Sequence, residues 1–262
     1  MTASRVLIVG CGALAREIVA LTRDLPNVDV TCLPATLHNR PGGIPAAVRE
    51  RIRRRRAGYD RVFVAYADCG TGGLLDRVLE DEGVERLPGA HCYEFFAGRP
   101  EFARLTDAEP ATFFLTDFLA RNFDRLVWSG LGLDRYPELL PQYFGNYRRL
   151  VYLSQTNDPE LERAARRGAA RLGLAYEHRR TGYGELATTL AAVTSRPTSD
   201  LSVGGRWEGQ TSRPTSDLTA RSRSLGNVSR PARQLAAGRD AKRPVARPTE
   251  PTPDQPRVHG AA

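Results

Sequence analysis

The chain has 262 residues, 41% of them apolar, and no apolar stretch approaches the roughly 20 residues that a membrane-spanning helix needs. Its formal net charge is +8, but residues 194–262 carry 12 basic residues against 6 acidic ones, so the rest is nearly neutral. This distribution argues against nucleic acid as a partner. Four cysteines are too few for a disulfide scaffold, and the amino terminus shows no secretory signal, so we expect a soluble cytoplasmic protein.

Residues 1–193 alternate between strand-like and helix-like segments. Apolar runs predict strands at 5–10, 28–33, 61–66, 149–154 and 175–180. Apolar spacing, Pro near first turns and Gly stops predict helices at 13–25, 44–56, 74–83, 112–128, 134–147, 158–174 and 184–193. This alternation is typical of an α/β fold, a layered and mostly parallel Rossmann-like sheet with crossover helices on both faces.

Residues 194–262 differ in composition from the α/β domain. They are rich in Arg, Pro, Ser and Thr and poor in large apolar side chains, which predicts a disordered tail. The segment TSRPTSDL occurs twice, at 194–201 and at 211–218. Two copies are too few for a packed repeat array, and a duplication under low constraint is the favoured explanation.

Three of the four cysteines follow strands. Cys11 comes directly after VLIVG, Cys69 follows VFVAY by two residues, and Cys92 lies in the loop after ERLPG. Because loops after parallel strands lie at one carboxyl edge, we expect these thiols to converge. Three thiolates suit zinc or an iron–sulfur cluster and leave one position open for substrate. None of the spacings is a C-x-x-C pair, however, and isolated cysteines also serve as small core residues, the role we expect for Cys32.

Polar residues beside these cysteines are candidates for a further ligand or for acid–base chemistry. His91 precedes Cys92 and is expected to assist the metal, but neighbouring side chains diverge in an extended segment, which favours Cys92 as the ligand. His38, Glu94 and Asp68 complete the candidate catalytic residues. The expected ligand is a small anionic or thiol-type molecule.

The glycines at the first strand end permit a different function. Residues 10–15, GCGALA, match the dinucleotide fingerprint G-x-G-x-x-A, with Gly10, Gly12 and Ala15 at its defining positions. The acidic residue expected at the end of the next strand is missing, which weakens this interpretation. A second loop could hold a phosphate or carboxylate with backbone amides, and its residues are Gly70, Thr71 and Gly72.

Eight segments link the chain to a known family: CGALAREI, LPATLHNRP, DCGTGGLLD, GAHCYEFF, TFFLTDFLARNF, GLGLDRYPEL, YFGNYRRLVYLSQT and TGYGELATTL. Through them residues 5–193 resemble the bacterial and archaeal domain of unknown function 1638. The resemblance implies that four residues lie in segments typical of the family, namely Cys11, Cys69, His91 and Cys92. It implies no established activity. Some relatives are similar in setting to accessory proteins of corrinoid methyl-transfer systems, where thiolate-bound zinc activates a thiol acceptor.

The leading hypothesis is therefore a Cys/His metal site holding zinc or an iron–sulfur cluster, with methyl-group transfer as the reaction and corrinoid proteins as partners. The first alternative is a Rossmann-like protein that binds a nucleotide at the GCGALA loop. The second is a non-enzymatic adaptor whose basic tail contacts acidic partners. Removing the tail would abolish the function of an adaptor, whereas Cys69→Ser would abolish that of a metal protein.

Overall fold

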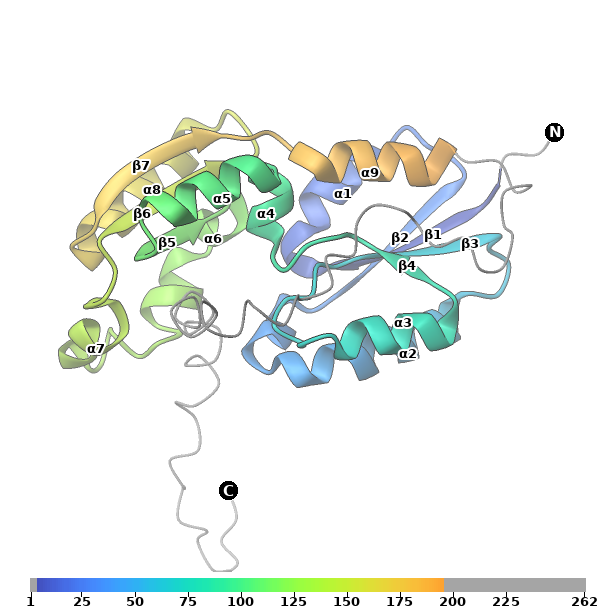
Figure 1. The fold of residues 1–262 in the computed structure, drawn as a ribbon, viewed down its shortest axis with the longest axis horizontal. Coiled ribbons are helices and arrows are strands. Elements are labelled where there is room, and N and C mark those ends of the chain that lie inside the picture. Colours follow the sequence, from blue (N-terminus) through green and yellow to red (C-terminus); the bar gives the residue numbers. More distant parts are fainter. Residues whose placement is uncertain (1–3, 196–262) are drawn as a thin grey trace, which may run out of the picture.

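The computed structural model describes residues 4–195, and its strands form two separate parallel sheets (Figure 1). The first sheet has the order β2-β1-β3-β4 and the second has the order β5-β6-β7. The strands are β1 (Val6–Cys11), β2 (Val28–Leu33), β3 (Arg61–Ala65), β4 (Glu85–Arg86), β5 (Thr112–Leu115), β6 (Arg149–Ser154) and β7 (Ala175–Arg180). The α/β fold with parallel strands is confirmed, but the strands divide between two sheets where one was expected.

Strand β1, inside the first sheet, is apolar throughout because helices cover both of its faces. Every residue of β1 is buried, and Ile8 lies level with Val30 of β2 and Phe63 of β3. In an antiparallel sheet with one solvent-exposed face, apolar and polar residues would alternate along each strand. The continuous apolar pattern thus reflects a sheet buried on both sides.

The first sheet is covered by four helices, and together they form the first lobe. These are α1 (Ala15–Thr22), α2 (Ile44–Arg55), α3 (Leu74–Glu82) and α9 (Gly184–Ser195). Figure 1 shows α1 and α9 on one face and α2 and α3 on the other. The connections contain the short 3₁₀ turns η1 (Gly12–Leu14), η2 (Ala35–Asn39) and η3 (Pro41–Gly43). Helix α9 comes last in this part of the chain, yet its Leu186, Leu190 and Val193 are buried in the core of the first lobe.

The second sheet and its helices form the second lobe. Its helical elements are α4 (Cys92–Ala97), α5 (Arg99–Ala108), α6 (Asp117–Arg121), the π-helical turn η4 (Asp124–Trp128), the 3₁₀ turn η5 (Pro137–Leu139), α7 (Leu140–Phe144) and α8 (Pro159–Leu172). Residues of α4 and α5 pack on one face of the sheet, and residues of α6, α7 and α8 pack on the other. No helix among residues 4–195 is long and apolar enough to cross a membrane.

Helix α4 joins the two lobes. Phe95 and Phe96 are buried in the core of the first lobe, whereas Tyr93 and Ala97 pack beside Phe114 of the second sheet. The rings of Tyr93 and Phe114 stack with centroids 5.6 Å apart. A helix of six residues therefore touches both cores, and Cys92 is its first residue.

Two expectations about local structure are corrected. The helix predicted over 112–128 begins as strand β5, because TFFL is fully buried between two helical layers, and a short apolar run has no period that separates strand from helix. Helix α9 extends to Ser195, so the first two residues of the expected tail are helical. Residues 196–262, with the rest of the predicted disorder and nearly all of the repeat, lie outside the described residues.

Candidate functional site

Three strand ends of the first sheet lie at one edge. Strand β1 ends at Cys11, β3 at Ala65 and β4 at Arg86, and these strands are parallel. Cys69 and Cys92 follow the ends of β3 and β4. This carboxyl edge lies on the side of α4 and the second lobe (Figure 1).

Backbone contacts draw the loops of this edge together. The amides of Asp68 and Cys69 donate to the carbonyls of Gly89 and Ala90 at 3.1 and 2.9 Å, so the loop after β3 runs beside the loop that leads to Cys92. A methyl group at Gly70 would lie 3.6 Å from Cγ of Pro41, in the loop after β2. Three separate connections thus meet around the cysteines.

Cys11, Cys69 and Cys92, here called the thiol cluster, differ in exposure and local conformation. Cys11 is 3% exposed, and its Sγ accepts a hydrogen bond from the Ala13 amide at 3.3 Å. Cys69 and Cys92 are half-buried. Cys69 has a φ of +51°, a left-handed conformation that no other non-glycine residue shows among residues 4–195. Such a conformation is costly for a side chain other than Gly, Asn or Asp.

The thiols of the cluster lie within electrostatic range of one another. Burial raises the pKa of Cys11 to about 11, and burial together with the nearby Cys11 thiol raises the pKa of Cys69 to about 12. Burial, then the Cys69 and Cys11 thiols, raise the pKa of Cys92 well above its ordinary value. All three are therefore neutral near pH 7, and each would lose a proton on binding a metal ion.

Two neutral imidazoles accompany the thiols. Burial lowers the pKa of both His38 and His91. The two rings are also close enough for His38 to lower the pKa of His91 further. Nδ1 of His38 lies 3.0 Å from the Ala35 carbonyl, so it carries the proton and leaves Nε2 free to accept. Both ring nitrogens of His38 are 4.0 Å from Sγ of Cys11. A free imidazole nitrogen beside a thiol is suited to ligate or to accept a proton.

Tyr66 is a member of the site that the sequence did not point to. It follows β3 directly and is 0% exposed, and its ring stacks on that of His38 at 6.1 Å and 10°. Its hydroxyl makes no hydrogen bond of normal geometry within the described residues. Burial and then the Cys11 thiol raise its pKa. The Cys11 thiol is thus the group toward which this hydroxyl can donate, and the interaction would strengthen if the thiol were a thiolate.

The carboxylates proposed for acid–base chemistry are engaged with their own loops. Asp68 accepts the Thr71 hydroxyl at 2.6 Å and the amides of Gly73 and Gly72 at 2.9 and 3.1 Å. Burial alone would raise the pKa of Asp68, but these hydrogen bonds outweigh it and the pKa is lowered. Glu94 accepts the Ala90 amide at 2.8 Å. Both side chains thereby hold the loops that carry the cysteines.

The glycines of GCGALA are accounted for by packing of the chain on itself. A methyl group at Gly12 would lie 2.8 Å from the Leu33 carbonyl oxygen, and one at Gly10 would lie 2.6 Å from Cδ1 of Ile18. Strand β2 ends at Leu33 without an acidic residue. In the second loop, the amide of Gly72 that was expected to meet an anion donates to Asp68. Three amides of the two loops are thus used within the chain, that of Ala13 by Cys11 Sγ and those of Gly72 and Gly73 by Asp68.

Cys32 differs from the thiol cluster in its position. It lies within β2, level with Gly10, and its Sγ would be 3.3 Å from a methyl group there. It is half-buried, and burial raises its pKa. Cys32 precedes the last residue of its strand, whereas Cys11 ends strand β1 and Cys69 and Cys92 follow strands. Its thiol is nevertheless close enough to raise the pKa of Cys11.

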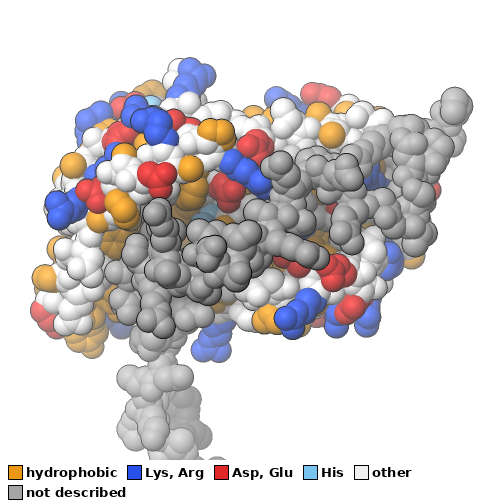
Figure 2. Space-filling model, in the orientation of Figure 1, with side chains coloured by type: hydrophobic (Ala, Val, Ile, Leu, Met, Phe, Trp, Pro, Cys, Tyr) orange, Lys and Arg blue, Asp and Glu red, His pale blue; other side chains and the backbone are white. Residues whose placement is uncertain are grey.

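The charge pattern of the described residues is mixed. On the face drawn in Figure 2, basic and acidic side chains are interspersed without a field of one sign. Arg49, Arg53 and Arg56 of the basic segment after β2 pair with the buried Glu82. Within residues 4–195, no three His, Cys, Asp or Glu side chains stand in an arrangement that could hold a metal ion as they are placed.

The second lobe contains a buried polar network at the carboxyl edge of its own sheet. Asp117, 1% exposed, accepts the Tyr152 hydroxyl at 2.7 Å, the Gln155 amide at 3.1 Å, and the amide and hydroxyl of Thr156 at 2.9 and 2.5 Å. In the sequence Asp117 stands out only as a polar residue among aromatic ones. With four donors from β6 and the following turn, it fixes the start of α6 to the sheet.

Comparison with known proteins gives one match. No curated protein and no solved structure is similar to the chain. The family model for "Protein of unknown function (DUF1638)" matches residues 32–190. The match includes Cys69, His91 and Cys92, while Cys11 and the segment CGALAREI precede it. The chain belongs to the DUF1638 family.

Proposed function

We propose that the thiol cluster of Cys11, Cys69 and Cys92 binds zinc or an iron–sulfur cluster, with His38 or His91 beside it and one position open to a small anionic or thiol-type ligand. The observation that carries the proposal is the electrostatic coupling of three thiols that come from three different strand-end loops. Isolated core cysteines have no reason to gather in this way.

The donor set fits a soft metal in its chemistry. Thiolates and neutral imidazoles are the ligands that zinc and iron–sulfur clusters take in proteins. The buried hydroxyl of Tyr66 faces the Cys11 thiol and lowers its pKa as a hydrogen-bond donor, which is typical of the surroundings of such sites. A bound zinc ion would hold a thiol ligand as thiolate.

The side chains have to turn inward on binding, because no three of them stand in a metal-holding arrangement as placed in residues 4–195. Binding free energies of structural zinc sites, about 10 kcal/mol or more, exceed the cost of a few side-chain rotations. Methyl-group transfer and corrinoid protein partners remain predictions from the family resemblance.

The proposal is tested by elemental analysis and absorption spectroscopy of anaerobically purified protein. We expect a stoichiometric amount of zinc, or iron with sulfide and a brown chromophore. Cys11→Ser, Cys69→Ser and Cys92→Ser should each lose the metal because each removes one thiolate.

Cys32→Ser is the matched control: this thiol lies inside strand β2, and although it also raises the pKa of Cys11, it does not lie at the end of a strand as the thiols of the cluster do. It should retain the metal in full. Metal-free protein after anaerobic reconstitution with zinc or with iron and sulfide, or equal loss in Cys32→Ser, would refute the proposal.

A further inference from the structure

A second candidate site lies at the junction of the two lobes. A pocket of about 440 Å³ opens where α4 meets α5 and where β7 leads into α9. Its lining residues are Phe96, Ala97, Gly98, Glu101, Arg179, Arg180, Thr181, Gly184 and Glu185. The volume is within the range of small-molecule sites, which favour the carboxyl ends of parallel strands and the boundaries between domains.

The wall of this pocket is fixed by close contacts. Gly184 has a φ of +50°, and a methyl group on it would lie 2.3 Å from the Phe95 carbonyl oxygen. Any other residue at 184 would therefore separate the start of α9 from the end of α4. The hydroxyl of Thr181 donates to the Ser154 carbonyl at 3.1 Å, which holds the turn after β7 to the sheet.

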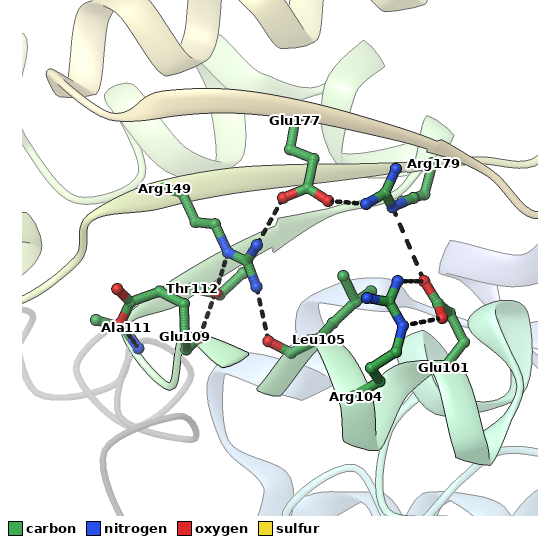
Figure 3. Close-up of polar contacts among 9 residues, drawn as sticks. All are labelled: Glu101, Arg104, Leu105, Glu109, Ala111, Thr112, Arg149, Glu177 and Arg179. Atoms are coloured by element: carbon green, nitrogen blue, oxygen red, sulfur yellow. Dashed lines mark hydrogen bonds and ion pairs between the residues drawn. The ribbon is translucent and has the colours of Figure 1, made fainter. Parts of the chain in front are cut away.

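Two of the charged residues of the lining are already neutralised. Figure 3 shows Arg179 between Glu177, at 2.6 Å, and Glu101, at 3.8 Å. Glu101 also pairs with Arg104 at 2.6 Å, and Glu177 pairs with Arg149 at 2.6 Å. These ion pairs form a continuous network along α5 and the second sheet, so Arg179 and Glu101 have little charge left to offer a ligand.

Arg180 and Glu185 are different. Neither makes an ion pair or a side-chain hydrogen bond to another described residue, although both line the same pocket. An anion would pair with Arg180 but would be repelled by Glu185, whereas a cation would pair with Glu185 and be repelled by Arg180. A molecule that carries both charges satisfies both residues. Phe96 and Ala97 add an apolar wall.

We propose that this pocket binds a small zwitterion of the α-amino acid class with an apolar side chain. Arg180 pairs with its carboxylate, Glu185 pairs with its ammonium group, and its side chain lies against Phe96 and Ala97. The site is independent of the thiol cluster, which lies at the opposite end of α4.

The test is calorimetric titration of the full chain with L-phenylalanine. We expect saturable binding that weakens roughly 10- to 100-fold in Arg180→Gln and in Glu185→Gln, as is usual when a charged hydrogen bond is lost. Phenylpropionate, which lacks the ammonium group, and phenethylamine, which lacks the carboxylate, should each bind the unaltered chain more weakly by a similar factor.

Arg77→Gln and Glu80→Gln, exposed residues of α3 far from the pocket lining, are the matched controls and should bind L-phenylalanine like the unaltered chain. Absence of saturable binding overturns the proposal. Equal binding of phenylpropionate and L-phenylalanine overturns the zwitterion, and a loss in the controls equal to that in the pocket variants overturns the assignment to Arg180 and Glu185.

Discussion

Cys69 has a left-handed backbone that favours glycine, and it lies between Asp68 and Gly70 in a turn that already contains glycines. A cysteine in this conformation costs about 1 kcal/mol or more relative to glycine. The two hydrogen bonds that join residues 68 and 69 to the loop before α4 hold it in place. The strain is consistent with a position where the thiol itself is needed.

Comparison of two substitutions at Cys69 separates the thiol from the backbone. Cys69→Gly relieves the strained conformation. We therefore expect its free energy of unfolding, measured in urea, to be about 1 kcal/mol higher than that of Cys69→Ser. Both variants should lose the metal. If the glycine variant were the less stable of the two, φ at residue 69 would not be strained in the folded protein.

Among the elements, α6 is held by one carboxylate. Asp117→Asn places an amide donor opposite donors of Tyr152, Gln155 and Thr156, so at least one buried donor loses its acceptor. We expect a loss of about 3 kcal/mol in the free energy of unfolding, measured in urea.

Asp107→Asn is the control for this substitution. Asp107 is exposed in α5 and should change stability by less than about 0.5 kcal/mol. A similar small change for Asp117→Asn would mean that water replaces the missing acceptor.

Sequence reasoning succeeded for elements whose signals are local. The runs at β1 and β3 are continuous and bounded by turns, and their parallel order follows from the helices between them, so the arrival of Cys11 and Cys69 at one edge could be inferred. Cys92 follows β4, which has only two residues and is not among the predicted strands. Strand β5 has only four residues, all buried, and leads directly into a helix, so its period carried no information.

The parts of the sites that were missed depend on contacts between distant segments. Tyr66 is the last residue of a predicted strand, but only the packed structure places His38 on its ring and its hydroxyl beside the Cys11 thiol. The pocket residues Arg180 and Glu185 adjoin Phe96 because α4 and α9 cross between the lobes. The spacing of residues in the sequence does not predict this contact between α4 and α9.

At the scale of the whole molecule, the first lobe depends on α9. Leu186, Leu190 and Val193 are each at most 5% exposed in its core, and burying side chains of this kind stabilises by about 1.5–3 kcal/mol each. Their combined contribution is comparable to the roughly 5–15 kcal/mol that stabilises a typical domain.

A chain that ends after Gly182 should therefore lose the cooperative thermal transition of the first lobe, as followed by circular dichroism. A chain that ends after Ser195 retains every described core residue and serves as the control, with a cooperative transition expected. Equal melting of the two chains would show that α9 is dispensable.

Because α4 leaves the first lobe and α9 returns to it, the second lobe is an insertion within the first. Domains of most proteins complete their folding in the order in which the ribosome releases them. Here the order is reversed: the second lobe has all of its strands before α9 emerges, whereas the first lobe, begun with β1, lacks its last core helix until then. During synthesis the loops that carry the three cysteines therefore belong to a core that still lacks α9, at a stage when all strands of the inserted lobe have been made.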